Sequence, residues 1–223
     1  MADDPKNGSA AEQDALDLDF ETMELKVGPS HPATHGTVRI QLKLDGERIV
    51  FSEVEVGYLH RGFEKECESG LYYQAFPYTD RLNYVSPMIN NVGYALAVEK
   101  LFGVEVPPRC QYLRTIASEV SRMSDHFTCL GACALELGAF TAFLYGVEAR
   151  ELVWDIHDEM CGARVTCNYV RIGGISADVG PEFKAFVAEK LAQIAKLRKD
   201  FEDLLLSNPI FIERMENTGL LAK

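Results

Sequence analysis

The sequence GPSHPATHG occupies residues 28–36 and places two histidines, His31 and His35, on a segment punctuated by proline and glycine. Proline fixes its own backbone angle and pushes the preceding residue into extended geometry, whereas glycine adopts angles that other residues avoid. The segment therefore predicts a shaped loop. Because the imidazole pKa lies near neutrality, the two histidines are candidates for proton transfer or metal binding. The alternative is that they hydrogen-bond only to backbone or solvent.

Apolar residues alternate with polar ones on both sides of this loop. The alternating residues are Met23, Leu25 and Val27 before it, and Val38, Ile40, Leu42 and Leu44 after it. Asp45-Gly46 is a hairpin-turn signal, and a third short run with Ile49 and Phe51 follows. We expect residues 21–60 to form a small antiparallel β-sheet in which the histidine loop joins the first two strands.

From residue 61 the apolar period becomes helical. The expected helices span residues 63–75, residues 79–102, a segment opened by Pro107-Pro108, residues 146–169 and residues 183–206. The fold class is therefore α+β, with the small N-terminal sheet followed by a mostly helical bundle over residues 61–223. Residues 1–20 are acidic and poor in apolar side chains, so we expect a disordered or partner-ordered arm there.

Composition excludes several classes of function. The net charge of −12 argues against nucleic acid as a partner, because phosphate neutralisation requires an excess of Lys and Arg. The six cysteines lie mostly in helical-looking segments and no signal peptide is seen, so we expect a reduced cytosolic compartment and not disulfides. None of them forms a CxxC pair, and Cys129 and Cys133 lack further ligands for a metal site. No nucleotide-binding or iron-sulfur motif is present, so any electron carriers are expected in partner chains.

Residues 127–147 are nearly long enough for a membrane span and carry Glu136 as their only charge. A carboxylate at mid-span is costly in lipid, so we favour two buried helical pieces broken near Gly138 over a transmembrane helix. Burial of Glu136 would raise its pKa unless a cationic or hydrogen-bonding group compensates. A histidine from the loop of residues 28–36 is one suitable partner.

Other polar residues stand in apolar surroundings. Arg81 and Tyr84 are three apart and are expected on one helical turn, where they either line a pocket or act structurally, with Arg81 paired to a carboxylate and Tyr84 in the core. Several arginines are candidates for buried ion pairs or subunit contacts. They are Arg61, Arg81, Arg114, Arg122, Arg164 and Arg171. Glu119 and Arg122 form a candidate pair on one helix.

These segments, in this order, resemble the quinone-site D subunit of NADH-quinone oxidoreductase, respiratory complex I, a family related to the nickel-iron hydrogenase large subunits. The matching motifs are GPSHPATHG at 28–36, GYLHRGFEK at 57–65, QAFPYTDRLNYVS at 74–86, AVEK at 97–100, GAR at 162–164 and YVRIGG at 169–174. The resemblance runs from about residue 23 to the end. Family chains are roughly twice as long, so it implies a fragment or one piece of a divided subunit.

The resemblance implies a role for each matching residue. His35 and Tyr84 would hold the quinone headgroup as catalytic residues, with His31 in a supporting place. Glu136 would be the acid that partners His35 in proton coupling, although relatives commonly carry aspartate. Arg61 and Arg81 would lie near the terminal iron-sulfur cluster of a neighbouring subunit. Thr166, where many relatives carry histidine, would lie near the same cluster, and we expect this exchange to favour a lower-potential quinone.

The implied function is the quinone-binding subunit of a proton-translocating NADH:quinone oxidoreductase, inactive alone. The chain itself would bind no cofactor or metal. NADH, FMN and iron-sulfur clusters would be held by partner subunits, with quinone as substrate. The chain would attach peripherally to the membrane arm on the cytoplasmic side of the bacterial inner membrane. The alternatives are the same role in a complex with ferredoxin or another donor, and a non-catalytic assembly fragment.

Overall fold

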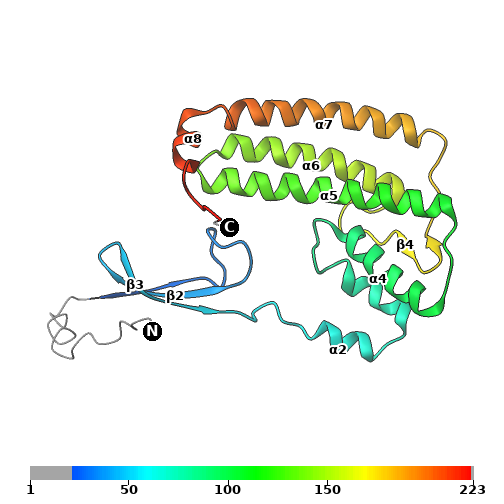
Figure 1. The fold of residues 1–223 in the computed structure, drawn as a ribbon, viewed down its shortest axis with the longest axis horizontal. Helices are drawn as coiled ribbons and strands as arrows, with labels where there is room; N and C mark the ends of the chain where they lie inside the picture. The colour runs from blue at the N-terminus through cyan, green and yellow to red at the C-terminus, as the bar shows by residue number, and fades with distance from the viewer. Residues whose placement is uncertain (1–21, 222–223) are drawn as a thin grey trace, which may run out of the picture. The chain divides into compact units, whose positions relative to one another are not determined.

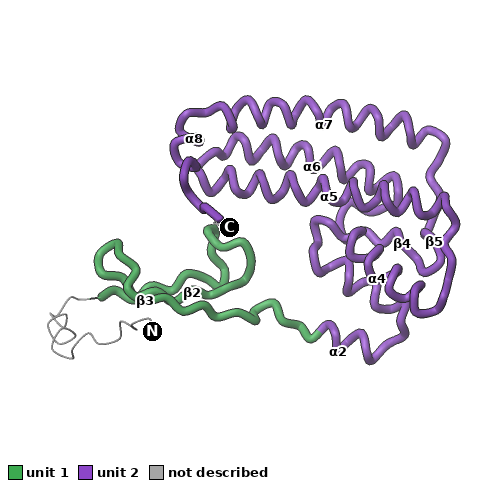
Figure 2. Tube along the Cα trace, in the orientation of Figure 1, with its two compact units in different colours: residues 1–62 green, residues 63–223 purple. Residues whose placement is uncertain are grey.

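The structure, a computed structural model, describes residues 22–221, so the expected arm of residues 1–20 lies outside the described residues. The chain divides into two compact units, residues 1–62 and residues 63–223, coloured separately in Figure 2. The first unit contains a sheet, and the second is mostly helical. The predicted α+β fold class, a small antiparallel sheet followed by a helical region, is confirmed.

The sheet has three antiparallel strands in the order β1-β2-β3 (Figure 1). They are β1 (Met23–Val27), β2 (Arg39–Asp45) and β3 (Arg48–Glu55). Leu25 pairs with Leu42 and Val27 pairs with Ile40, which places the alternating apolar residues of β1 and β2 on one face. The predicted loop between the first two strands and the hairpin after Asp45 are therefore confirmed.

The two faces of this sheet differ in polarity. In the β2–β3 register, Ile40 pairs with Val54 and Leu44 with Ile49, so the apolar face continues onto β3. The opposite face carries ion pairs between Arg39 and Glu55, 3.0 Å apart, and between Lys43 and Glu24, 3.7 Å apart. Met23, Ile49 and Val54 of the apolar face are each more than half exposed.

The second unit begins with short helical segments and continues with longer ones. In chain order they are α2 (Phe63–Glu68), the 3-10 helix η1 (Tyr72–Ala75), α3 (Phe76–Thr79), α4 (Pro87–Phe102), α5 (Pro108–Glu136), α6 (Phe140–Cys161), the two-residue strands β4 (Val170–Arg171) and β5 (Gly174–Ile175), α7 (Phe183–Leu205) and α8 (Pro209–Met215). Helix α7 matches the prediction for residues 183–206 within one residue.

Three predicted helix boundaries are wrong for local reasons. The helix expected over residues 63–75 stops at Glu68, where Ser69-Gly70 interrupts it before η1. The helix expected from residue 79 begins only at Pro87, because a residue that precedes proline is disfavoured in helical geometry. The helix expected over residues 146–169 starts earlier, at Phe140, and ends at Gly162, whose φ of 72° is left-handed.

The long apolar segment around residue 138 forms two helices and not one. Helix α5 ends at Glu136 and α6 begins at Phe140, with Gly138 between them at a φ of 85°. The predicted break near Gly138 is therefore confirmed. Among residues 22–221, none of the helices combines the length and apolar character that a bilayer span requires.

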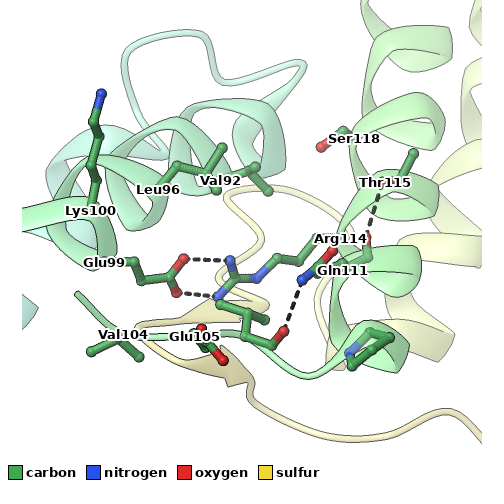
Figure 3. A pocket seen from close by; sticks show the side chains of 12 residues that line it. Val92, Leu96, Glu99, Lys100, Val104, Glu105, Gln111, Arg114, Thr115 and Ser118 are labelled. Carbon is green, nitrogen blue, oxygen red and sulfur yellow. Dashed lines mark hydrogen bonds and ion pairs between the residues drawn. The ribbon is translucent and has the colours of Figure 1, made fainter. Parts of the chain in front are cut away.

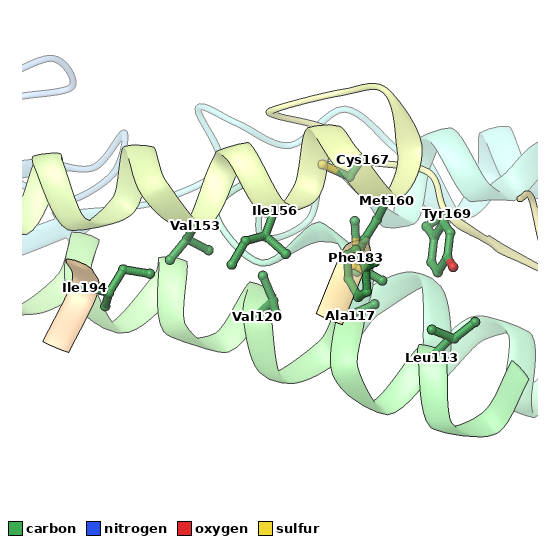
Figure 4. Close-up of a cluster of buried hydrophobic side chains, with 11 residues drawn as sticks. Leu113, Ala117, Val120, Val153, Ile156, Met160, Cys167, Tyr169, Phe183 and Ile194 are labelled. Atoms are coloured by element: carbon green, nitrogen blue, oxygen red, sulfur yellow. The ribbon is translucent and has the colours of Figure 1, made fainter. Parts of the chain in front are cut away.

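Helices α5, α6 and α7 run side by side in the second unit, α5 against α6 and α6 against α7 (Figure 1). Their buried side chains form one cluster, shown in Figure 4. It contains Leu113, Ala117 and Val120 from α5, Val153, Ile156 and Met160 from α6, and Phe183 and Ile194 from α7, with Met88, Cys167 and Tyr169. Burial of these side chains drives the helices together.

Two facing glycines allow α5 and α6 to approach closely. A Cβ atom built on Gly146 would lie 3.0 Å from the carbonyl oxygen of Phe127 and 3.4 Å from the Cα atom of Gly131. Both glycines are buried. The crossing of α5 and α6 therefore depends on the absence of side chains at these two positions.

The bundle interior also holds a histidine. His157 of α6 is fully buried, and its Nε2 atom lies 3.3 Å from Oγ of Ser121 on α5. Burial lowers the pKa of His157 from 6.5 to about 4, because the charged imidazolium is poorly solvated there. The folded state therefore binds this proton less readily than the unfolded state does.

We predict that His157 makes the bundle sensitive to acid. Its stabilising contribution is complete above pH 6.5, the unfolded-state pKa, and is lost as the pH falls toward about 4. The free energy of unfolding of the native chain should fall by about 3 kcal/mol more than that of His157→Gln between pH 7 and pH 4. Urea titrations at several pH values measure this difference. The exposed His126→Gln variant is the control, and parallel curves for all three proteins would contradict the prediction.

Candidate functional site

Tyr84 lies on a tight turn and not on a helix. Residues 80–86 form consecutive turns and bends between α3 and α4, so the expectation that Arg81 and Tyr84 share a helical turn is wrong. The physical reason is again Pro87, which sets the start of α4. The Tyr84 side chain is 65% exposed. The alternative that Tyr84 is an aromatic residue of the core is therefore wrong for the part of the chain that the structure describes.

The turn that carries Tyr84 begins at a buried carboxylate. Asp80 is only 1% exposed, and its Oδ1 atom accepts a hydrogen bond of 2.8 Å from Nη1 of Arg81. The same nitrogen donates to the carbonyl oxygen of Pro77 at 2.8 Å. Arg81 is thus paired with a carboxylate, which one of the two alternatives drawn from the sequence predicted. Part of its side chain remains accessible to solvent.

A buried asparagine connects this region to a distant loop. Asn91 of α4 accepts a hydrogen bond of 2.9 Å from Oγ1 of Thr79, and its Nδ2 atom donates to the carbonyl oxygen of Cys167 at 3.0 Å. Within the turn, Nδ2 of Asn83 donates to Oγ of Ser86 at 2.7 Å. The structure therefore brings the loop of residues 162–169, which contains Thr166, to the base of the Tyr84 turn.

Thr166 adopts an unusual backbone conformation in that loop. Its φ of 53° is left-handed, which is rare for a β-branched residue, and its hydroxyl donates to the carbonyl oxygen of Val165 at 2.7 Å. Arg164 anchors the same loop to α6 through Asp155 at 2.5 Å and Glu151 at 2.7 Å. Hydrogen bonds from Lys190 and Arg164 lower the pKa of Asp155, which keeps this anchor charged.

The histidine loop belongs to the first unit. A Cβ atom at Gly28, which has a φ of 92°, would lie 2.0 Å from the carbonyl oxygen of Val38, so only glycine fits at the entrance of the loop. The Nδ1 atom of His31 accepts a hydrogen bond of 3.1 Å from the backbone N–H of Ala33. His31 is thus engaged in the loop itself, and His35 presents an exposed side chain nearby.

The candidate residues are divided between the two units. His31, His35 and Arg61 lie in the first, whereas Arg81, Tyr84, Glu136 and Thr166 lie in the second. The local contacts given above hold His31 in the first unit, and Arg81 and Thr166 in the second. The pairing of His35 with Tyr84 and with Glu136 stays a prediction.

Glu136 does not occupy the buried position expected for it. It is the last residue of α5 and its side chain is exposed, so the inference of a desolvated carboxylate is wrong for the described structure. The reason is the break at Gly138, which ends the helix at this point and turns the chain back. A role of Glu136 in proton coupling stays a prediction.

No metal-binding cluster of three or more His, Cys, Asp or Glu side chains occurs within residues 22–221. Cys129 and Cys133 lie on α5 and are both exposed.

The sequence did not predict a pocket that lies between α4 and α5 (Figure 3). Its volume is about 940 Å³, and apolar residues such as Val92, Leu96 and Val104 line much of it. Glu99 from α4 and Arg114 from α5 point toward each other at one side. The embedded position of Arg114 in the sequence was the only available signal for this feature.

The contact between Glu99 and Arg114 is a buried bidentate ion pair. Nη1 of Arg114 lies 2.9 Å from Oε2 of Glu99, and Nη2 lies 2.5 Å from Oε1, with both side chains about 95% buried. Nη2 also donates to the carbonyl oxygens of Arg171 and Gly174, and Gly173 N–H donates to Glu99. The guanidinium of Arg114 lowers the pKa of Glu99 through these hydrogen bonds. The predicted burial of an arginine in an ion pair is confirmed for Arg114.

The sequence of this chain is similar to known proteins. Residues 136–223 match the family described as respiratory-chain NADH dehydrogenase, 49 Kd subunit. The NADH-quinone oxidoreductase D subunit 1 of Sorangium cellulosum is 55% identical over 208 residues, which are 93% of this chain and 52% of that protein. Over most of its length, this chain is therefore similar to the D subunits of NADH-quinone oxidoreductases. The Myxococcus xanthus D subunit is 46% identical over 223 residues, 99% of this chain and 54% of its own length.

The chain spans about half the length of the curated D-subunit relatives that it matches. The fold of this chain also resembles a solved structure. A chain of the membrane-bound sulfane sulfur reductase, an archaeal respiratory membrane complex, is 32% identical with a TM-score of 0.84. The match covers 92% of this chain and 55% of that chain.

We predict that the Arg114–Glu99 pair is required for stability. Arg114→Met leaves the Glu99 carboxylate buried without its partner, which should lower the free energy of unfolding by about 3–5 kcal/mol. The matched control is Arg122→Met, which removes an exposed partner of Glu119 on the same helix and should cost at most about 1 kcal/mol. Chemical denaturation measures both changes, and equal effects of the two substitutions would contradict a special role for the buried pair.

Proposed function

We propose that this chain is the quinone-site subunit of a proton-translocating NADH:quinone oxidoreductase. The observation that carries the proposal is its 55% identity to an NADH-quinone oxidoreductase D subunit along 93% of the chain. The resemblance of the motifs around His35 and Tyr84 supports the assignment to the quinone site. The chain alone is not expected to reduce quinone.

The chemistry proposed for His35 and Tyr84 follows from the substrate. Two-electron reduction of a quinone converts both carbonyl oxygens into developing oxyanions, which need hydrogen-bond donors and protons. An imidazole and a phenol supply both. The 65% exposure of Tyr84, on a turn tied down at its base through Asp80 and Asn91, supports its availability to a ligand.

Electrons would reach the quinone from NADH through FMN and iron-sulfur clusters, all held by partner subunits. Arg61, Arg81 and Thr166 would lie near the terminal cluster. This placement is supported by Asn91, which hydrogen-bonds to Thr79 just before the Arg81 turn and to Cys167 in the loop that contains Thr166. Glu136 would then exchange a proton with His35 and couple reduction to proton transport in membrane subunits.

Exposed apolar surfaces support a place within a larger assembly. One face of the β1-β2-β3 sheet is apolar and exposed, as described above. In the second unit, an apolar groove of about 670 Å³ runs between α5 and α7, lined by residues such as Phe127, Leu130 and Leu191. Such surfaces are typical of protein contacts. We place the chain peripherally on the cytoplasmic side of the bacterial inner membrane, between the iron-sulfur subunits and the membrane arm.

The likeness to the membrane-bound sulfane sulfur reductase favours a second candidate. In this alternative the chain has the same position in a related complex that takes electrons from ferredoxin or another donor. Membranes that contain the complex distinguish the two: quinone reduction driven by NADH supports the first, and reduction driven only by reduced ferredoxin supports the second.

A third candidate function is that of a non-catalytic assembly fragment. The observation behind it is that the chain covers 52% of the Sorangium cellulosum D subunit. Complementation of a strain that lacks the D-subunit gene tests it. Restoration of quinone reductase activity by this chain together with a separate second half would identify one half of a divided catalytic subunit. Assembly without activity in that experiment would favour the fragment.

We predict that Tyr84→Phe and His35→Ala each lower quinone-reductase turnover in the assembled complex by at least about tenfold, because each removes a proton donor. Turnover in membranes, at saturating electron donor, measures the effect. Tyr112→Phe and His126→Ala are matched controls, since both residues are exposed on α5 and lie outside the proposed site. Full activity of both Tyr84→Phe and His35→Ala would contradict the proposal that these residues bind the quinone headgroup.

We predict that Thr166→His makes the potential of the adjacent partner cluster more dependent on pH, because it places a titratable cation in the loop of residues 162–169. Histidine also tolerates the left-handed φ of 53° better than the β-branched threonine does. Redox titrations of the complex between pH 6 and pH 8 measure the change. Thr166→Asn fits the same backbone but does not titrate, so an equal effect of both variants would contradict the prediction.

A further inference from the structure

Two cysteines at the end of α6 share one hydrogen-bond acceptor. The Sγ atom of Cys161 lies 3.5 Å from the carbonyl oxygen of Ala163, and the Sγ atom of Cys167 lies 3.0 Å from the same oxygen. The Sγ atom of Cys161 also lies 3.2 Å from the carbonyl oxygen of His157. The two sulfur atoms therefore meet at the carbonyl oxygen of Ala163, although neither cysteine belongs to a CxxC motif.

The two thiols have unequal environments. Cys167 is fully buried, whereas Cys161 is partly exposed. The neighbouring thiol of Cys167 lowers the pKa of Cys161, whereas the neighbouring Cys161 and burial raise the pKa of Cys167. The thiolate, which is the reactive form of cysteine, therefore forms at the sulfur that solvent can reach.

The backbone between the two cysteines holds them together. Gly162, at a φ of 72°, and Thr166, at 53°, both adopt left-handed geometry and turn the chain back toward α6. The carbonyl oxygen of Cys167 accepts a hydrogen bond of 3.0 Å from Nδ2 of Asn91. An unfavourable conformation at Thr166 is thus maintained by its surroundings, which is a common property of reactive segments.

We propose that Cys161 and Cys167 form a peroxide-responsive dithiol that closes to an intramolecular disulfide. The Cys161 thiolate attacks one peroxide oxygen, the O–O bond breaks, and Cys161 becomes a sulfenic acid while hydroxide leaves as water after protonation. The sulfur of Cys167 then attacks the Cys161 sulfur, the S–S bond forms and a second water leaves. In total, two thiols are oxidised by two electrons and one hydrogen peroxide is reduced to two waters.

Another cysteine pair provides an internal comparison. Cys129 and Cys133 are exposed and four residues apart on α5. Both thiols are accessible, and desolvation, the largest cause, raises the pKa of Cys129, which disfavours its thiolate. The proposal concerns the Cys161 environment and is independent of the proposed quinone chemistry.

The sequence provides a direct assay. Trypsin cleaves after Arg164, between the two cysteines, so a disulfide appears in mass spectrometry as residues 151–164 linked to residues 165–171. Cells that express the chain are treated with hydrogen peroxide and quenched in acid, and free thiols are then alkylated before digestion. We expect the linked peptide to increase at least about fivefold and to disappear after dithiothreitol treatment. Cys129 and Cys133 should remain alkylated at the same peroxide dose.

Two variants test the assigned order of steps. In Cys167→Ala, Cys161 should stop at the sulfenic acid, which dimedone captures. In Cys161→Ser, Cys167 should stay reduced, because it is buried and lacks an activated partner. The proposal is overturned if Cys161 and Cys167 stay fully alkylated at peroxide doses that oxidise Cys129 or Cys133. A disulfide from Cys161 to glutathione or to another cysteine in the native chain would overturn it as well.

Discussion

The buried ion pair between Arg114 and Glu99 is the constraint on which the arrangement of the helical unit depends. It joins α4 to α5, and its remaining hydrogen bonds go to the backbone of residues 171–174. Two charges can be withdrawn from water at this site because every contact is paired and bidentate geometry strengthens the attraction. The pair thus fixes β4 and β5 against both helices, and it holds the end of the loop that follows α6.

Polar contacts, rather than regular secondary structure, position the side chains proposed to act in catalysis. The Tyr84 turn is held by the Arg81–Asp80 ion pair and by the hydrogen bond between Thr79 and Asn91. The loop that contains Thr166 is held by Asn91 and by the contacts of Arg164 with α6. Each tie uses a buried or half-buried group that would be costly to leave unpaired. The result is an exposed phenol on a constrained backbone, which suits a group that must meet a ligand.

The thiol pair lies within the same network. The carbonyl oxygen of Cys167 accepts a hydrogen bond from Asn91 and its thiol donates to the carbonyl oxygen of Ala163, so the loop of residues 162–169 carries both a structural contact and the proposed dithiol. Elsewhere the chain leaves apolar surface uncovered, on one face of the sheet and in the groove between α5 and α7. Local order and exposed apolar surface therefore coexist in the described residues.

The sequence by itself determined the sheet, the long helices, the break at Gly138 and the likeness to D subunits, because period, proline and glycine act locally and because the motifs are long. The start of α4 is likewise a local effect, because Pro87 interrupts an otherwise helical pattern, whereas the exposure of Glu136 follows from how α5 lies in the folded unit. Tertiary structure alone decided that Arg114 meets Glu99, that Asn91 reaches Cys167 across 76 residues, and that the sulfur atoms of Cys161 and Cys167 share the carbonyl oxygen of Ala163. Contacts of this kind depend on how helices pack in three dimensions, which no local pattern encodes.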